Sequence, residues 1–194
     1  EIKALGNYTT TYDSASLKDS YHYLDPVTNI RVTDGILSWD EVEDAQGYRI
    51  SVDGVVQSAK LTDNTYELVS GKSVRVKLMP YNENGNYFSS WTNEQTFYIL
   101  NSPDAKWNSS IELDGEAKNN FYWDSESANG FTVKLEKEGA EPQIFTIASA
   151  TSFEYAYTDT GVYKVSVKAN APAGDATTYD SVYSKPIVVG RLAA

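Results

Sequence analysis

The sequence contains no cysteine, and it has one histidine and one methionine among its 194 residues. Without cysteine the chain has neither disulfides nor thiolate metal ligands. Any Ser-His-Asp triad would have to use His22, the single imidazole, and no Gly-x-Ser-x-Gly elbow accompanies it. We therefore expect His22 to be a strand or surface residue. The sequence predicts no catalytic residues, no cofactor and no enzyme activity.

Two further absences narrow the class of protein. No apolar run reaches the roughly 18 residues that a membrane-spanning helix needs. The formal net charge of −11 repels the phosphates of nucleic acids and anionic lipids. We expect neither nucleic-acid binding nor membrane insertion.

Acidic residues are abundant, which raises the question of a calcium site. Asp13, Asp40, Glu41, Glu43 and Asp44 offer the hard oxygen ligands that Ca²⁺ prefers. However, no Asp-x-Asp-x-Asp-Gly loop is present, and apolar Val42 interrupts the acidic run. The expected outcome is no metal site, with calcium between modules as the alternative.

What the chain has in quantity points to β structure. Hydrophobic residues make up 41% of it and aromatic residues 13%, including 15 Tyr and 4 Trp. This is enough apolar material for packed cores, and Thr, Tyr and Val favour strands. Helical periodicity is hard to find.

Two short motifs recur along the chain. Thr-Thr-Tyr-Asp-Ser occurs at 10–14 and again at 177–181, and Trp39-Asp40 recurs as Trp123-Asp124 at about half that separation. A recurrence at one and two periods indicates a tandem array of small modules.

Alternating apolar residues and turn pairs predict the strands of these modules. In the first module, Tyr48, Ile50 and Val52 are expected on one face of a strand and Arg49 and Ser51 on the other. Asp-Gly pairs at 34–35 and 53–54 predict tight hairpins. The strands expected in the first module are 27–32, 36–39, 48–52, 65–68, 74–78 and 95–100. Those expected in the second are 121–124, 130–135, 152–154, 163–167 and 186–189.

The resulting fold prediction is all-β. With the strand expected after the Asp53-Gly54 hairpin, the first module has seven short strands and frequent turns in about 80 residues, and the second module repeats this order. The pattern predicts a Greek-key sandwich in each module. We predict a sandwich at 26–100 and a second at 101–190, with 191–194 as a disordered tail or cloning remnant. Trp39 and Trp123 are expected in the two cores.

Residues 1–25 fit only the end of the module template. Ile2-Lys3-Ala4 aligns with Val167-Lys168-Ala169, and Tyr21 to Leu24 aligns with the final strand. We predict that 1–25 is the closing β-hairpin of a preceding module or an N-terminal extension. Because an isolated hairpin is marginally stable, we expect it to pair with its missing module half, another chain or the neighbouring sandwich.

Both modules resemble the fibronectin type III superfamily, specifically the divergent versions of bacterial surface proteins; an immunoglobulin-like variant of the second module is an alternative. The residues that carry the resemblance are Trp39, the run Ala45 to Ile50, and the segment from Tyr81 to Trp91. Together with the tandem repeat, the missing catalytic set and the short junction from Leu100 to Pro103, the resemblance predicts a non-catalytic fragment of a secreted or cell-surface bacterial protein. This fragment would space or present other domains and take part in adhesion. No Arg-Gly-Asp sequence for integrin binding is present.

Aromatic and amide side chains outside the predicted cores suggest an alternative function, carbohydrate binding beside a glycoside hydrolase. Sugar rings stack on aromatic faces while amides fix the hydroxyls. The expected partner is then a polysaccharide, and otherwise another surface protein. A small hydrolase built on one carboxylate pair is a third class. The candidate glycan-binding residues are Tyr81, Asn82, Asn86, Tyr87, Trp91 and Trp107.

Overall fold

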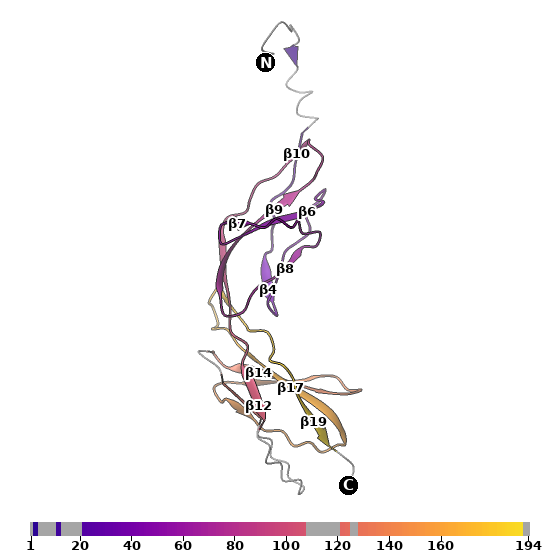
Figure 1. Ribbon diagram of the computed structural model, residues 1–194, viewed down its shortest axis with the longest axis vertical. Helices are drawn as coiled ribbons and strands as arrows, with labels where there is room; N and C mark the ends of the chain where they lie inside the picture. The colour runs from indigo at the N-terminus through magenta and orange to yellow at the C-terminus, as the bar shows by residue number, and fades with distance from the viewer. Residues whose placement is uncertain (1, 4–10, 13–20, 108–120, 125–127, 192–194) are drawn as a thin grey trace. The chain divides into compact units, whose positions relative to one another are not determined.

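A computed structural model describes residues 2–3, 11–12, 21–107, 121–124 and 128–191 (Figure 1). All of its described elements are strands. The chain separates into two compact units. Unit 1 comprises Glu1–Arg31, Leu37–Tyr66 and Val74–Thr96, and unit 2 comprises Val32–Ile36, Glu67–Ser73 and Phe97–Ala194. The module boundaries after residues 25, 100 and 190 stay predictions.

The first seven-strand set forms two sheets. The three-stranded sheet has the order β4-β5-β8, and the other has the order β11-β9-β6-β7 with β18 added beyond β11. The strands are β4 (Arg31–Thr33), β5 (Ile36–Ser38), β6 (Gly47–Val52), β7 (Val55–Val56), β8 (Thr65–Glu67), β9 (Ser73–Tyr81) and β11 (Gln95–Ile99).

Two Asp-Gly pairs make the hairpins of this set, as the sequence predicts. Asp34 and Gly35 have φ of 48° and 78° between β4 and β5, and Asp53 and Gly54 have φ of 49° and 81° between β6 and β7. Positive φ at both central residues is the type I′ geometry, whose twist matches that of antiparallel strands.

Trp39 lies fully buried in unit 1, as predicted. Its ring meets that of Tyr48 edge-on, with centroids 5.2 Å apart and an interplanar angle of 77°. The hydroxyl of Tyr48 accepts a hydrogen bond from the buried amide of Val42 at 2.9 Å, so one side chain packs the core and satisfies the loop before β6.

Burial along β6 follows the predicted faces except at the end of the strand. Tyr48 and Ile50 are buried and Arg49 is exposed, but Ser51 is buried and Val52 only half-buried. Ser51 is flanked by Val56 on β7 and Lys77 on β9, whereas Val52 ends the strand beside the Asp53-Gly54 turn. Neighbouring strands cover Ser51, and the strand end leaves Val52 open.

The second seven-strand set lies wholly in unit 2. Its sheets have the orders β12-β13-β16 and β15-β14-β17-β19, with all pairs antiparallel. The strands are β12 (Asp104–Trp107), β13 (Phe121–Asp124), β14 (Phe131–Lys137), β15 (Gln143–Ile147), β16 (Ser152–Phe153), β17 (Gly161–Ala169) and β19 (Ile187–Arg191).

The core of unit 2 repeats that of unit 1 with one difference. Trp123 is buried and meets Phe131 edge-on at 5.2 Å and 65°, as Trp39 meets Tyr48. Phe131 has no hydroxyl with which to hold a loop amide. Tyr163, Val165 and Val167 point into this core, as their alternation predicts.

The strand order confirms the predicted fold class, two tandem seven-stranded β-sandwiches, while several strands differ from the prediction. The first strand begins at Arg31 rather than Val27, and the last continues to Arg191, which the sequence analysis placed in the tail. Residues 192–194 lie outside the described part. Strands that the sequence analysis missed are β10 (Tyr87–Phe88), β12, β15 and β18 (Thr178–Tyr179).

The N-terminal segment contributes three short strands. β1 (Ile2–Lys3) pairs antiparallel with β2 (Thr11–Tyr12), and β3 (His22–Tyr23) pairs parallel with β10 in unit 1. β3 and β10 form a two-stranded sheet of their own rather than extending either sandwich sheet. The rest of the aligned residues before Tyr21 lie outside the described ranges.

Candidate functional site

The candidate site is a pairing between two strands, which we call the junction. One strand lies in a loop of one sandwich, and the other is the closing strand of another sandwich. In unit 2, β18 runs parallel to β11, with Tyr98 opposite Thr178 and Ile99 opposite Tyr179. Tyr98 donates its amide to the carbonyl of Thr177 at 2.7 Å, and Leu100 donates its amide to that of Tyr179 at 3.1 Å. Leu100 itself belongs to the hydrophobic core of unit 2.

The same pattern of bonds occurs in unit 1. β3 runs parallel to β10, where His22 donates its amide to the carbonyl of Asn86 at 2.9 Å and Leu24 to that of Phe88 at 2.9 Å. Leu24 is buried with 7% exposure, and Leu100 with 6%. In each junction, donors two residues apart on one strand reach carbonyls two residues apart on the other.

A ring contact completes the correspondence. Phe97 lies one residue before Tyr98, and its ring centroid is 5.8 Å from that of Tyr179. Tyr21 lies one residue before His22, and its ring centroid is 5.3 Å from that of Phe88. The segment Tyr21 to Leu24 is therefore equivalent, residue by residue, to Phe97 to Leu100.

Two buried serines attach the segment after β18 to β17. Ser181 donates its amide to the carbonyl of Ala169 at 3.0 Å, and Ala169 donates its amide to Oγ of Ser181 at 2.9 Å. Ser184 and Val167 exchange the same two bonds at 2.8 and 3.1 Å. In unit 1, Thr92 and Leu78 do likewise at 2.8 and 3.0 Å. Hydroxyls thus satisfy strand amides where the backbone ladder is interrupted.

Asp175 shapes the turn that leads into β18. Its carboxylate accepts hydrogen bonds from the amide and hydroxyl of Thr177, both at 2.8 Å, and from the amide and hydroxyl of Thr178 at 3.1 and 2.7 Å. These bonds, led by that from the Thr178 hydroxyl, lower the pKa of Asp175 to about 2. The ionised carboxylate therefore holds the turn at neutral pH.

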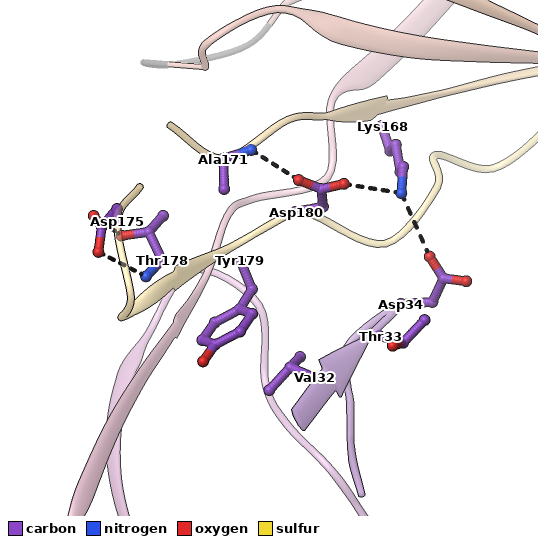
Figure 2. A pocket seen from close by; sticks show the side chains of 9 residues that line it. All are labelled: Val32, Thr33, Asp34, Lys168, Ala171, Asp175, Thr178, Tyr179 and Asp180. Carbon is purple, nitrogen blue, oxygen red and sulfur yellow. Dashed lines mark hydrogen bonds and ion pairs between the residues drawn. The ribbon is translucent and has the colours of Figure 1, made fainter. Parts of the chain in front are cut away.

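A pocket of about 310 Å³ lies beside this turn within unit 2 (Figure 2). Lys168 reaches into it and pairs with Asp180 at 3.0 Å and with Asp34 at 3.8 Å, and Asp180 also accepts the amide of Ala171 at 2.9 Å. Burial by itself lowers the pKa of Lys168, but the hydrogen bond and charge of Asp180 and the charge of Asp34 together raise it. The charges at the pocket wall are thus paired with one another.

The ring of Tyr183 adds a further contact to Lys168. The ammonium groups of Lys134 and Lys168 lie 4.8 and 5.5 Å from the centroid of this ring. At these distances the ring face attracts both cations. This contact helps to fix the segment between the two buried serines.

The candidate glycan-binding residues divide between the units. Tyr81, at the end of β9, carries the ammonium of Lys60 at 4.8 Å and the guanidinium of Arg49 at 5.9 Å from its ring centroid. Asn82 donates its side-chain amide to the carbonyl of Asp44 at 2.7 Å and accepts the amide of Asn84 at 2.9 Å. Both residues therefore already have partners within unit 1.

The remaining candidates have different surroundings. Tyr87 stacks on His22 with centroids 5.0 Å apart and 25° between planes, whereas Asn86 is exposed and Trp91 half-buried. Trp107 ends β12 in unit 2 and packs against its core, 6.5 Å from the ring of Tyr157. Tyr81 to Trp91 form one segment of unit 1, and Trp107 belongs to the other unit. Glycan contact by any of them stays a prediction.

Of the candidate calcium ligands, Asp40 already has protein partners. Its carboxylate accepts hydrogen bonds from Asn29 at 2.5 Å and Arg31 at 2.9 Å, and these lower its pKa. Asp13 lies outside the described residues. Within the described ranges, no three His, Cys, Asp or Glu side chains gather as a metal site requires. The same ranges hold no helix that is long and apolar enough to cross a membrane.

One recurring motif marks the junction in the sequence. The second Thr-Thr-Tyr-Asp-Ser copy covers β18, Asp180 and Ser181. Its recurrence predicted a repeated module, whereas the parallel pairing with β11 was not predicted. The first copy contributes Thr11 and Tyr12 to β2, and its other residues lie outside the described part.

No protein-family model and no curated protein sequence matches the chain. Among solved structures, a two-domain fibronectin type III segment of chicken tenascin matches with a TM-score of 0.40 and 13% identity, over 86% of this chain and 100% of that one. The FN1-FN3 domains of chicken CNTN1 match with a TM-score of 0.40 and 12% identity, over 88% and 67%. The fold is assigned from the strand order of the two sandwiches.

Proposed function

We propose that the chain is a non-catalytic tandem β-sandwich segment of a secreted or cell-surface bacterial protein, a spacer and adhesion scaffold that presents other domains. The observation that carries the proposal is the entry of Leu100 into the core of unit 2 directly after β11 ends at Ile99. A chain that passes from a closing strand into the next core has no long flexible linker there. Such a connection suits a segment whose task is to hold other domains in place.

The hydrogen bonds of β18 support the same role. To pull the chain straight at Leu100, two hydrogen bonds must break, the one from Leu100 to Tyr179 and the one from Tyr98 to Thr177. Leu100 must also leave the core. Each of these changes costs free energy, so the connection resists opening.

Protease shaving of intact cells that produce the protein tests its location. We expect peptides from exposed loops, such as the one around Gly174, to be released while an internal marker protein stays intact. Peptides that appear only after cell lysis would contradict the proposed location.

Carbohydrate binding at residues 81–91 is the second candidate function. It is favoured by the exposed amide of Asn86 and the half-buried rings of Tyr87 and Trp91 in one short segment. Affinity electrophoresis against a panel of polysaccharides should show retardation that Trp91→Ala abolishes. Trp107→Ala in unit 2 is the matched variant. Retardation by no polysaccharide, or equal retardation of the Trp91→Ala chain, would remove residues 81–91 as a sugar site.

A further inference from the structure

The equivalence of β3 and β11 leaves one feature of β3 unexplained, the exposure of its aromatic side chains. Phe97 and Ile99 of β11 are 2% and 0% exposed, because they point into a sandwich core. Their counterparts Tyr21 and Tyr23 are 44% and 80% exposed. Large aromatic side chains gain free energy from burial, so two of them at core positions of an uncovered strand indicate a missing neighbour.

We propose that β3 is the closing strand of a further sandwich of the same strand order, formed by residues that precede it in the same polypeptide. Tyr21 and Tyr23 are core residues of that sandwich, as Phe97 and Ile99 are of theirs. The proposal concerns residues that the proposed function does not use, and it stands or falls independently of cell-surface location.

The backbone of β3 supports this assignment. His22 and Leu24 direct their amides to β10, so the amide of Tyr23 between them points to the opposite edge. In β11 the corresponding edge is paired, because β11 lies between β18 and β9. The sheet of β3 and β10 has no third strand among the described residues. The free edge of β3 therefore matches the edge that β9 occupies on β11.

The connection after β3 points to the same polypeptide as the source of the missing sandwich. Leu24 is buried and Val27 follows it with 6% exposure, so buried residues connect β3 directly to the first seven-strand set. β11 leads in the same way through Leu100 into the core of unit 2. The other strands of the sandwich that β11 closes precede β11 in the chain.

A fusion protein tests the proposal with the full chain. Residues 26–76 of the chain, placed before Glu1, supply a second copy of strands β4 to β8 and the first half of β9, but no closing strand. Glu1 to Leu24 must then complete the added sandwich. By hydrogen exchange followed by NMR, we expect the amide of Tyr23 to exchange at least about 100-fold more slowly than in the unfused chain.

Two matched fusions make each outcome decisive. A fusion of residues 26–99 brings its own closing strand and should leave the exchange of Tyr23 unchanged. A 26–76 fusion with Tyr21→Phe and Tyr23→Ile carries at these positions the side chains that Phe97 and Ile99 place in a core. It shows whether a lack of protection arises only because the two tyrosines do not fit the added core. Protection at position 23 in either 26–76 fusion, but not in the 26–99 fusion, supports the proposal.

Three results would overturn it. One is a folded 26–99 fusion beside two 26–76 fusions that leave position 23 unprotected. Another is a Tyr23 amide that exchanges as slowly in the 26–99 fusion as in the 26–76 fusion. The third is protection of Tyr23 in the unfused chain that rises with protein concentration, which would assign β3 to pairing with a second copy of the chain.

Discussion

Leu100 donates its backbone amide to the carbonyl of Tyr179 at 3.1 Å, and the same bond recurs between Leu24 and Phe88 at 2.9 Å. In both places the donor is a buried leucine that leads from a short strand into the next core. The recurrence identifies a repeated structural element, in which a loop strand of one sandwich pairs in parallel with the closing strand before it. Five predictions follow from this element and from the cores that it connects.

The turn between β4 and β5 should tolerate no side chain at Gly35. Alanine there would place its Cβ 2.8 Å from Cγ1 of Val182, in addition to the strain of a φ of 78°. Gly54, with a φ of 81° and open space around it, is the matched position. We expect Gly54→Ala to cost about 1 kcal/mol and Gly35→Ala about 1–3 kcal/mol more, because overpacking adds to strain.

Urea unfolding measures both free energies, and Val182→Ala should restore most of the difference. Equal losses for Gly35→Ala and Gly54→Ala would show that Val182 does not contact the turn.

The buried hydroxyl of Ser181 should contribute measurably to the stability of unit 2. Ser181→Ala leaves the amide of Ala169 without its acceptor at a fully buried position. An unsatisfied buried donor costs about 1–3 kcal/mol. Ser149→Ala, at an exposed bend, should change the free energy of unfolding by less than about 0.5 kcal/mol. NMR-detected urea unfolding of unit 2 distinguishes the two, and identical midpoints would contradict the assigned role.

The hydroxyl of Tyr48 should contribute to the stability of unit 1, although Phe131, which has no hydroxyl, takes the equivalent position in unit 2. Tyr48→Phe removes the acceptor of the buried Val42 amide and should destabilise unit 1 by about 1–3 kcal/mol. The ring contact with Trp39 remains, so tryptophan fluorescence of the folded state should be unchanged. An unaltered unfolding midpoint would mean that water replaces the hydroxyl at Val42.

Asp175 should make the turn before β18 sensitive to acid. Its pKa is lowered to about 2 in the folded chain, whereas an aspartate of an unfolded chain has a pKa of about 3.9. A lowered folded pKa gives stability that is present above the unfolded pKa and lost as the pH falls toward the folded one. We expect the loss between about pH 4 and pH 2, and Asp175→Asn should remove that part of the pH dependence.

An NMR titration of the Asp175 carboxyl measures the pKa directly. Thr178→Val removes the hydroxyl that lowers this pKa most and should therefore raise it. A pKa near 3.9 in the native chain would contradict the bonding described here.

How far the sequence predicted the structure depended on the length and pattern of each strand. Apolar and polar residues alternate cleanly in the strands that contain Tyr48 and Ile50 or Val165 and Val167. Both Asp-Gly pairs predict a tight hairpin turn. These elements fixed the fold class in advance. β15 is long but lies on a sheet edge with an exposed Ile144, so it lacks the contrast between faces that marks a strand.

The junction was harder to predict for a different reason. β10 and β18 are two residues long, and their partners lie far away in sequence. Nothing local distinguishes such a pair from a loop. The alignment of Tyr21 to Leu24 with a closing strand was visible in sequence, but the parallel pairing that supports it required the backbone bonds. The glycan candidates were chosen because aromatic residues lie beside amides in the sequence. The sequence does not show which of these side chains already contact other parts of the protein.

The most direct test of the repeated junction is amide hydrogen exchange of Leu24 and Leu100 in the unmodified chain, followed by NMR. Both amides should be protected, and Tyr98 and His22 should be protected with them, while the amide of Tyr23 exchanges at the rate of an unpaired residue. Free exchange of either Leu24 or Leu100 would contradict the equivalence of the two junctions.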